Sequence, residues 1–150
     1  MAQFNRAEAG GKSLWTDGWD GYPLARRRLL EQLTKTSNPV VIGGDVHAFF
    51  VSELKMDFDD ARAPVVASEF VGTSISSQHG GQQSLDKRRP ANPHVLLAEA
   101  RYRGYTRVDV TPKRMQVDLR AMESVQTREA ACSTLASFVV EDGKPGPVRA

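Results

Sequence analysis

Asp45 and His47 are the residues of this chain whose types and spacing best suit metal chemistry. They follow the apolar run 39–42 and the glycine pair Gly43 and Gly44. Two glycines after a short run of β-branched residues predict a strand that ends in a sharp turn, where the backbone can approach a ligand closely. In an extended segment the side chains at positions i and i+2 point the same way, so we expect Asp45 and His47 to converge on one ion.

Two ligands do not complete a metal site. A zinc, iron, manganese or calcium centre takes at least three or four ligands, so the others must come from elsewhere. The alternative for this pair is structural. Asp45 would then bond the backbone of its own turn, and His47 would be a core histidine satisfied by a carbonyl group.

The flanking sequence predicts the elements that must position this turn. Pro23 suits the first turn of a helix, and Ala25, Leu29 and Leu33 form an apolar stripe with Leu30 beside it, so we expect a helix over 24–35. Apolar and alternating patterns predict strands at 39–42, 48–54, 64–71, 105–110, 115–121 and 135–140. Residues 94–103 are ambiguous, because their propensities favour a helix.

The rest of the pattern concerns turns and one apolar face. Residues 57–63 read as a polar loop and 72–83 as a mobile loop rich in Gly, Ser and Gln. The strands at 105–110 and 115–121 should form a hairpin. Its buried face should carry Met115, Val117, Leu119 and Ala121.

Several segments resemble, in the same order along the chain, the closing half of the alkaline phosphatase D (PhoD-like) metallophosphatase family. Together they extend from about Trp15 to Gly143, and their shared order makes a chance match implausible. The segments are Trp19-Asp20-Gly21-Tyr22-Pro23, Ala25-Arg26-Arg27-Arg28-Leu29-Leu30, Asn38-Pro39-Val40-Val41-Ile42-Gly43-Gly44-Asp45-Val46-His47, Asp57-Phe58-Asp59-Asp60, the run 64–76, Arg103-Gly104-Tyr105, Asp109-Val110-Thr111-Pro112 and the run 133–143.

This resemblance implies a mixed α/β (α+β) fold, the C-terminal part of a layered two-sheet metallophosphoesterase fold (α/β/β/α). It also implies a strand, and not a helix, at 94–103. No upstream half with the family's earlier Asp and Asn ligands is found in the sequence, so we expect the N-terminal half of the fold to be lacking. The expected organisation is a polar N-terminal segment at 1–14, the PhoD-like part at 15–143 and a flexible tail at 144–150.

The resemblance also implies roles for four residues. Asp45 and His47 occupy the family's last metal-binding motif, and Asp20 and Tyr22 lie in its Trp-Asp-Gly-Tyr segment, where they would contact substrate. Divalent or trivalent metal ions are implied as cofactors, with calcium and iron as the family's precedent. From the residues alone, Asp20 fits equally well as a cap of the helix that begins near Pro23.

Composition describes an ordinary globular chain of 150 residues with a net charge of +2. The single cysteine excludes an internal disulfide.

No run is long and apolar enough for a signal peptide or a membrane span, so the chain as written would stay in the cytoplasm, whereas PhoD-like proteins are commonly exported. The basic clusters 26–28 and 87–89 could attract phosphate, but nearby acids balance them and nucleic-acid binding is disfavoured.

The resulting functional hypothesis is a metal-dependent phosphoesterase that hydrolyses phosphomonoesters or phosphodiesters. Its active site would be incomplete without a partner, the missing N-terminal half. The alternative is a catalytically inactive remnant or an interaction module of the same fold. The two differ in one respect, because an active centre should not tolerate the loss of Asp45 and His47.

Overall fold

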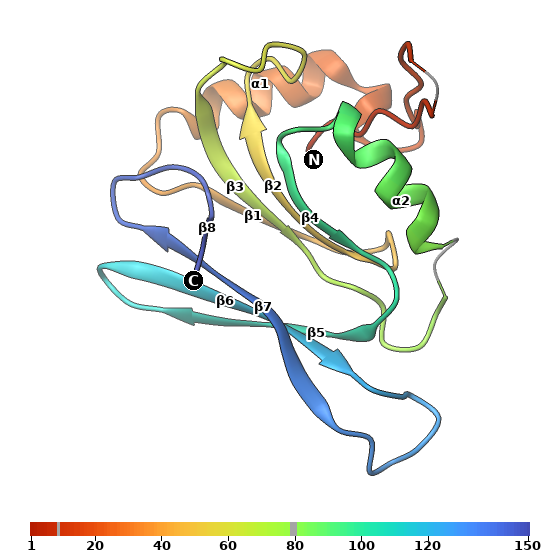
Figure 1. The fold of residues 1–150 in the computed structure, drawn as a ribbon. Coiled ribbons are helices and arrows are strands. Elements are labelled where there is room, and N and C mark those ends of the chain that lie inside the picture. The colour runs from red at the N-terminus through yellow and green to blue at the C-terminus, as the bar shows by residue number, and fades with distance from the viewer. Residues whose placement is uncertain (9, 79–80) are drawn as a thin grey trace.

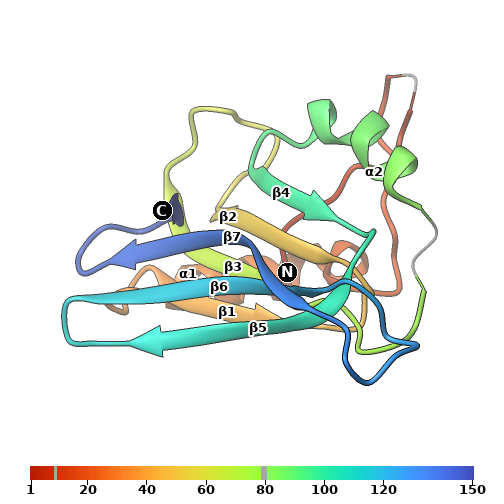
Figure 2. The same cartoon turned by 60° about the horizontal axis from the view of Figure 1, so that its bottom comes forward.

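The chain forms two four-stranded β-sheets that pack against each other, with the helices on the outer face of the first sheet (Figure 1). This computed structural model describes residues 1–8, 10–78 and 81–150. Figure 2 shows the same layers from a second direction. The described residues therefore form an α/β/β arrangement, and the predicted α/β class is confirmed.

The first sheet has the strand order β1-β3-β2-β4. Its strands are β1 (Val40–Gly43), β2 (Phe49–Lys55), β3 (Val65–Val71) and β4 (Val95–Glu99). β1 runs parallel to β3, and the other neighbours are antiparallel. The segment that suited either helix or strand is strand β4, because Val95 and Ala98 are buried against the α2 side of the sheet.

The second sheet is fully antiparallel, with the order β5-β6-β7-β8. It contains β5 (Arg103–Val110), β6 (Arg114–Met122), β7 (Cys132–Glu141) and β8 (Val148–Arg149). The predicted hairpin is β5 and β6, in which Val110 pairs with Met115. Val117, Leu119 and Ala121 are buried as expected, and Met115 packs at the edge of the core.

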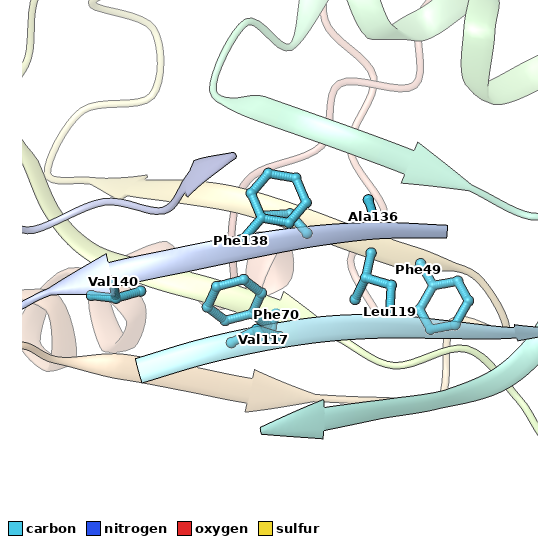
Figure 3. Close-up of a cluster of buried hydrophobic side chains, with 8 residues drawn as sticks. Phe49, Phe70, Val117, Leu119, Ala136, Phe138 and Val140 are labelled. Carbon is cyan, nitrogen blue, oxygen red and sulfur yellow. The ribbon is translucent and has the colours of Figure 1, made fainter. Parts of the chain in front are cut away.

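The main core lies between the two sheets (Figure 3). Phe49, Val51 and Phe70 come from the first sheet and meet side chains of β6 and β7. The rings of Phe70 and Phe138 approach edge to face, with their centroids 6.4 Å apart. Alternate residues of each strand supply this layer, which is the geometry that the strand period of two dictates.

Helix α1 (Pro23–Leu33) covers part of the first sheet, after a short 3-10 turn η1 (Trp19–Gly21). Pro23 occupies the start of the helix, as predicted. The predicted stripe holds at Leu33, which packs on the core, but its centre is Leu30, which is only 1% exposed, and not Leu29, which is 37% exposed. Leu30 packs on Leu54 and Ala67 and anchors the helix.

Three expectations about the less regular segments need correction. Helix α2 (Gln82–Arg88) and the 3-10 turn η2 (Arg89–Ala91) follow the loop, so the predicted loop over 72–83 ends earlier, and its residues 79 and 80 lie outside the described residues. The tail expected to be flexible contains β8, which pairs with β7. The N-terminal segment is not merely polar surface, because Gln3 is buried and Phe4 packs edge to face on Phe50. Among the described residues, no helix is long and apolar enough to cross a membrane.

Candidate functional site

The turn after β1 carries both predicted metal ligands in an unusual backbone conformation. Asp45 has a φ of 71° and His47 a φ of 58°, and the Val46 amide donates to the Gly44 carbonyl at 2.9 Å. The expectation of an extended segment is therefore wrong. Left-handed backbone at non-glycine residues costs about 1–3 kcal/mol and is enriched at functional sites.

The ring of His47 is oriented by a loop far away in sequence. Its Nδ1 lies 3.2 Å from the Gln78 carbonyl oxygen. A carbonyl oxygen only accepts hydrogen bonds, so this contact places the proton on Nδ1. In the neutral ring Nε2 then carries the lone pair and is the atom that can bind a metal ion, in the arrangement common to histidine ligands.

The guanidinium group of Arg103 holds the same turn by hydrogen bonds. Its Nη1 donates to the His47 carbonyl at 3.0 Å, to the Ser74 hydroxyl at 2.8 Å and to the Ser77 carbonyl. Its Nη2 donates to the Ala100 carbonyl. Burial lowers the pKa of this guanidinium. One side chain therefore ties the turn after β1, the loop after β3 and the end of β4 together.

Asp45 lines a cavity of about 710 Å³ at the end of β1. Its carboxylate is exposed, and none of the hydrogen bonds and ion pairs found among the described residues involves that carboxylate. Asp20 lines the same cavity, together with Arg6, Arg88 and Glu69. The structure thus brings Asp45 and Asp20 to one space, whereas His47 and Tyr22 are not among the residues that line it.

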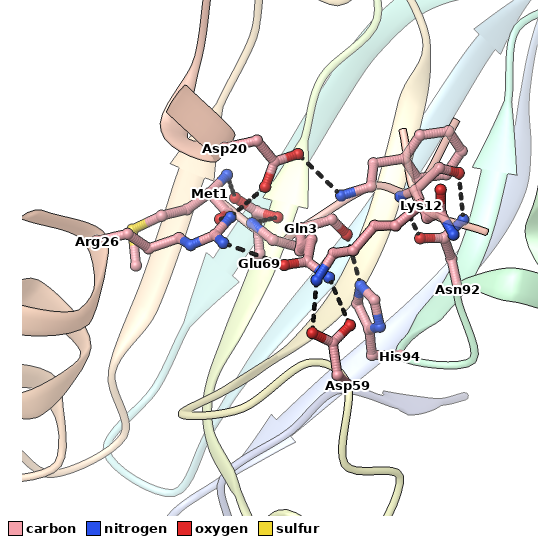
Figure 4. A network of polar contacts seen from close by, with 12 residues as sticks. Met1, Gln3, Lys12, Asp20, Arg26, Asp59, Glu69, Asn92 and His94 are labelled. Atoms are coloured by element: carbon pink, nitrogen blue, oxygen red, sulfur yellow. Dashed lines mark hydrogen bonds and ion pairs between the residues drawn. The ribbon is translucent and has the colours of Figure 1, made fainter. Parts of the chain in front are cut away.

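Asp20 belongs to a buried polar network (Figure 4), several of whose members line the cavity. One carboxylate oxygen accepts from Nη1 of Arg26 at 2.5 Å, and the other accepts from the Phe4 amide at 3.2 Å. The alternative role as a helix cap is wrong, because Tyr22 is the N-cap residue of α1 and no side chain caps this end. Tyr22 is 64% exposed.

Glu69 is the second carboxylate of this network. It accepts from the amino group of Met1 and, at 3.0 Å, from the Ala2 amide. Gln3 continues the network through Arg26, whose Nη2 lies 3.4 Å from the Gln3 side-chain oxygen. The N-terminal segment is therefore held against the first sheet and forms one wall of the cavity.

The described residues contain no group of three or more His, Cys, Asp or Glu side chains arranged to hold a metal ion. Asp45 and His47 supply a free carboxylate and a free imidazole nitrogen, which suit the rim of a metal centre but do not complete it. Sequence reasoning singled out these two residues as candidates. It missed the arrangement of Arg6, Arg88 and Arg103, of which Arg88 stood out only as part of the basic run 87–89 and Arg103 only as part of the segment Arg103-Gly104-Tyr105.

Comparison with known proteins gives consistent results. The model of the PhoD-like phosphatase family matches residues 1–119. Alkaline phosphatase D of Bacillus subtilis (strain 168) is 37% identical over 151 residues, which is 97% of this chain and 26% of that protein. A solved structure described as a structure of PhoD aligns with a TM-score of 0.85 at 36% identity and covers 99% of this chain and 29% of its own. The chain thus spans between a quarter and a third of the length of these relatives.

Proposed function

Because this chain belongs to the PhoD-like phosphatase family, we propose that it carries part of the metal centre of a metal-dependent phosphoesterase. Asp45 and His47 are the proposed metal ligands. The observation that supports this role most directly is the turn itself, in which two left-handed residues present a free carboxylate and a free Nε2 at the end of β1.

The remaining ligands would come from polypeptide outside this sequence. Two ligands hold a catalytic ion weakly, and the related proteins are about three to four times longer than the matched part. A partner segment would have to approach the rim formed by Asp45 and the open side of β1. The proposed substrate is a phosphomonoester or a phosphodiester.

Metal ions bound here would neutralise phosphate oxygens and lower the pKa of a bound water for attack on phosphorus. The chain's own residues would fix the geometry. Gln78 holds the His47 ring through Nδ1, and Arg103 holds the backbone of the turn. Asp20 would act by maintaining the cavity wall and bordering the substrate, since its oxygens are already engaged by Arg26 and Phe4. Calcium would favour the Asp45 carboxylate, and iron accepts imidazole, so both proposed metals fit this donor pair.

The test is to measure metal binding and phosphoesterase activity on the same preparation. Mn²⁺ titration should broaden amide NMR signals around residues 44–47 first, and His47→Ala and Asp45→Asn should remove this localised broadening. Asp109→Asn is the matched control, since Asp109 is an exposed aspartate on β5 of the second sheet. We expect hydrolysis of a bis-aryl phosphodiester to stay near background without the additional ligands.

Two results would contradict the proposal. If Mn²⁺ broadens the amide signals uniformly, and neither substitution changes this, Asp45 and His47 are not the ligands. Rapid turnover that is abolished by Asp45→Asn would instead show that this chain supplies a sufficient metal centre by itself.

A further inference from the structure

Two arginines face the same cavity without a full set of partners. Arg6 comes from the N-terminal segment and Arg88 from the last turn of α2, and both line the 710 Å³ cavity that Asp45 also lines. Burial lowers the pKa of Arg6, and the nearby charge of Arg88 lowers it further, while Asp20 opposes the shift. Two like charges brought together beside a cavity favour an anion between them.

Arg88 has an unused donor. Its Nη2 donates to Glu8 at 3.1 Å, but its Nε is buried and has no hydrogen-bond partner within the described part of the chain. An unsatisfied buried donor is costly, and a donor of a charged group more so. This pattern is typical of a side chain that is completed by a ligand.

Arg6 also forms no ion pair with a carboxylate among the described residues. Its guanidinium lies 4.6 Å from the centre of the Trp15 ring, and no ion pair to it is found among residues 1–8, 10–78 and 81–150. The buried acids near it are already neutralised, since Asp20 pairs with Arg26 and Glu69 with the amino group of Met1. The exposed Asp17 and Asp45 also line the cavity, and Asp45 is the proposed metal ligand.

We propose that Arg6 and Arg88 form a subsite that binds a phosphate group inside the cavity. A guanidinium fork matches the oxygens of phosphate, and two forks can engage one tetrahedral anion from two sides. The cavity is larger than a phosphate ion, so it also has room for the organic part of an ester beside Trp15 and Trp19. That the anion is the phosphate of a phosphoester rests on the proposed function, whereas the anion site itself does not.

The experiment measures phosphate binding by metal-free protein, so that no ion at Asp45 contributes. Inorganic phosphate and phenyl phosphate are titrated separately at constant ionic strength, followed by calorimetry and amide NMR shifts. Arg88→Met and Arg6→Met should each raise the Kd for phosphate about tenfold or more, since each removes charge-assisted hydrogen bonds. Thermal unfolding of each variant checks that it is folded, and Arg88→Lys serves as a second variant that retains the charge but lacks Nε.

Arg89→Met is the matched control, because Arg89 is the next residue, is exposed and does not line this cavity. It should leave the Kd unchanged. Equal weakening by Arg89→Met, or phosphate binding no stronger than that of chloride, would overturn the subsite. Asp45→Asn should abolish metal binding and keep phosphate binding, so failure of the metal site and failure of the subsite are distinguished. Tighter binding of phenyl phosphate than of inorganic phosphate supports the ester as ligand, and the opposite order overturns that identity and leaves a site for free phosphate.

Discussion

At the scale of single residues, the site depends on contacts that reach across the sequence. His47 is oriented by Gln78, and its carbonyl is held by Arg103, which is 56 positions away. The strained backbone at Asp45 and His47 persists because such contacts determine it more strongly than the local preference does. Metal ligands generally need this second layer of support.

Arg103 should therefore be a positioning residue for the turn. Arg103→Lys keeps the charge but loses the planar fork, and we expect it to lower the free energy of unfolding by about 2–4 kcal/mol. Urea unfolding measures this loss, and hydrogen exchange of the amides at 44–47 should become faster. Arg101→Lys is the control, since Arg101 lies at the surface and pairs with Glu99, and it should change the free energy of unfolding much less than Arg103→Lys does. Unchanged exchange at 44–47 would show that Arg103 does not hold the turn.

At the scale of elements, the sequence predicted the strands and helix α1 well, because burial in one layer leaves a clear period of two or 3.6. It failed for α2 because the segment 82–88 contains a single apolar residue, Leu85. It also failed for β8. This strand has only two residues, too few to show a hydrophobic period, and it exists only through its pairing with β7.

In the candidate site, too, features with a local sequence signal were predicted and features that depend on tertiary contacts were not. The Gly-Gly turn with Asp45 and His47 could be recognised locally, but its left-handed conformation and the gathering of Arg6 and Arg88 could not. The last two are 82 positions apart and meet only because α2 and the N-terminal segment border one cavity.

The corrected face of α1 gives a prediction with an internal control. Leu30→Ala should lower the free energy of unfolding by about 2–5 kcal/mol, since it leaves a cavity against Leu54 and Ala67. Leu29→Ala makes the same chemical change one position earlier on a more exposed face, and it should cost less than about 1 kcal/mol. Chemical denaturation of both variants measures the two free energies of unfolding. Equal decreases would show that Leu29 is packed as well as Leu30 is, as the predicted stripe through Leu29 requires.

At the scale of the whole molecule, the N-terminal segment joins parts that are otherwise separate. Gln3 reaches Asp59 at 3.1 Å, and its carbonyl lies 2.6 Å from Nε2 of the buried His94. Asn5 and Asn92 exchange backbone and side-chain hydrogen bonds at 2.7 and 2.9 Å. The stability of the cavity and that of the first sheet are therefore linked.

This link predicts how stability depends on pH. Burial lowers the pKa of His94 below its ordinary value of 6.5, against the opposing effect of the Gln3 carbonyl. The unfolded chain then binds a proton at a higher pH than the folded chain does. The contribution of His94 is present above pH 6.5 and is lost as the pH falls from 6.5 towards the lower folded pKa.

Urea unfolding at pH 7.5, 6.5 and 5.5 should show this decline, and His94→Gln should flatten it. The carboxyl groups whose pKa is lowered do not interfere, because Asp59, Glu99 and Asp118 lose their contributions only below their ordinary values of 3.8, 4.5 and 3.8. An equally steep decline in the variant would assign the dependence to another group.

The contacts between residues 3–5 and 92–94 also set an order of events during synthesis. The chain emerges from its N-terminus, so the hydrogen bonds that join Gln3 to His94 and Asn5 to Asn92 cannot form until Asn92 and His94 have left the ribosome. Closing such a long loop is slow compared with forming α1 or the β5–β6 hairpin. We therefore expect the wall that carries Arg6 to be among the last parts to settle, after the strands beneath it are in place.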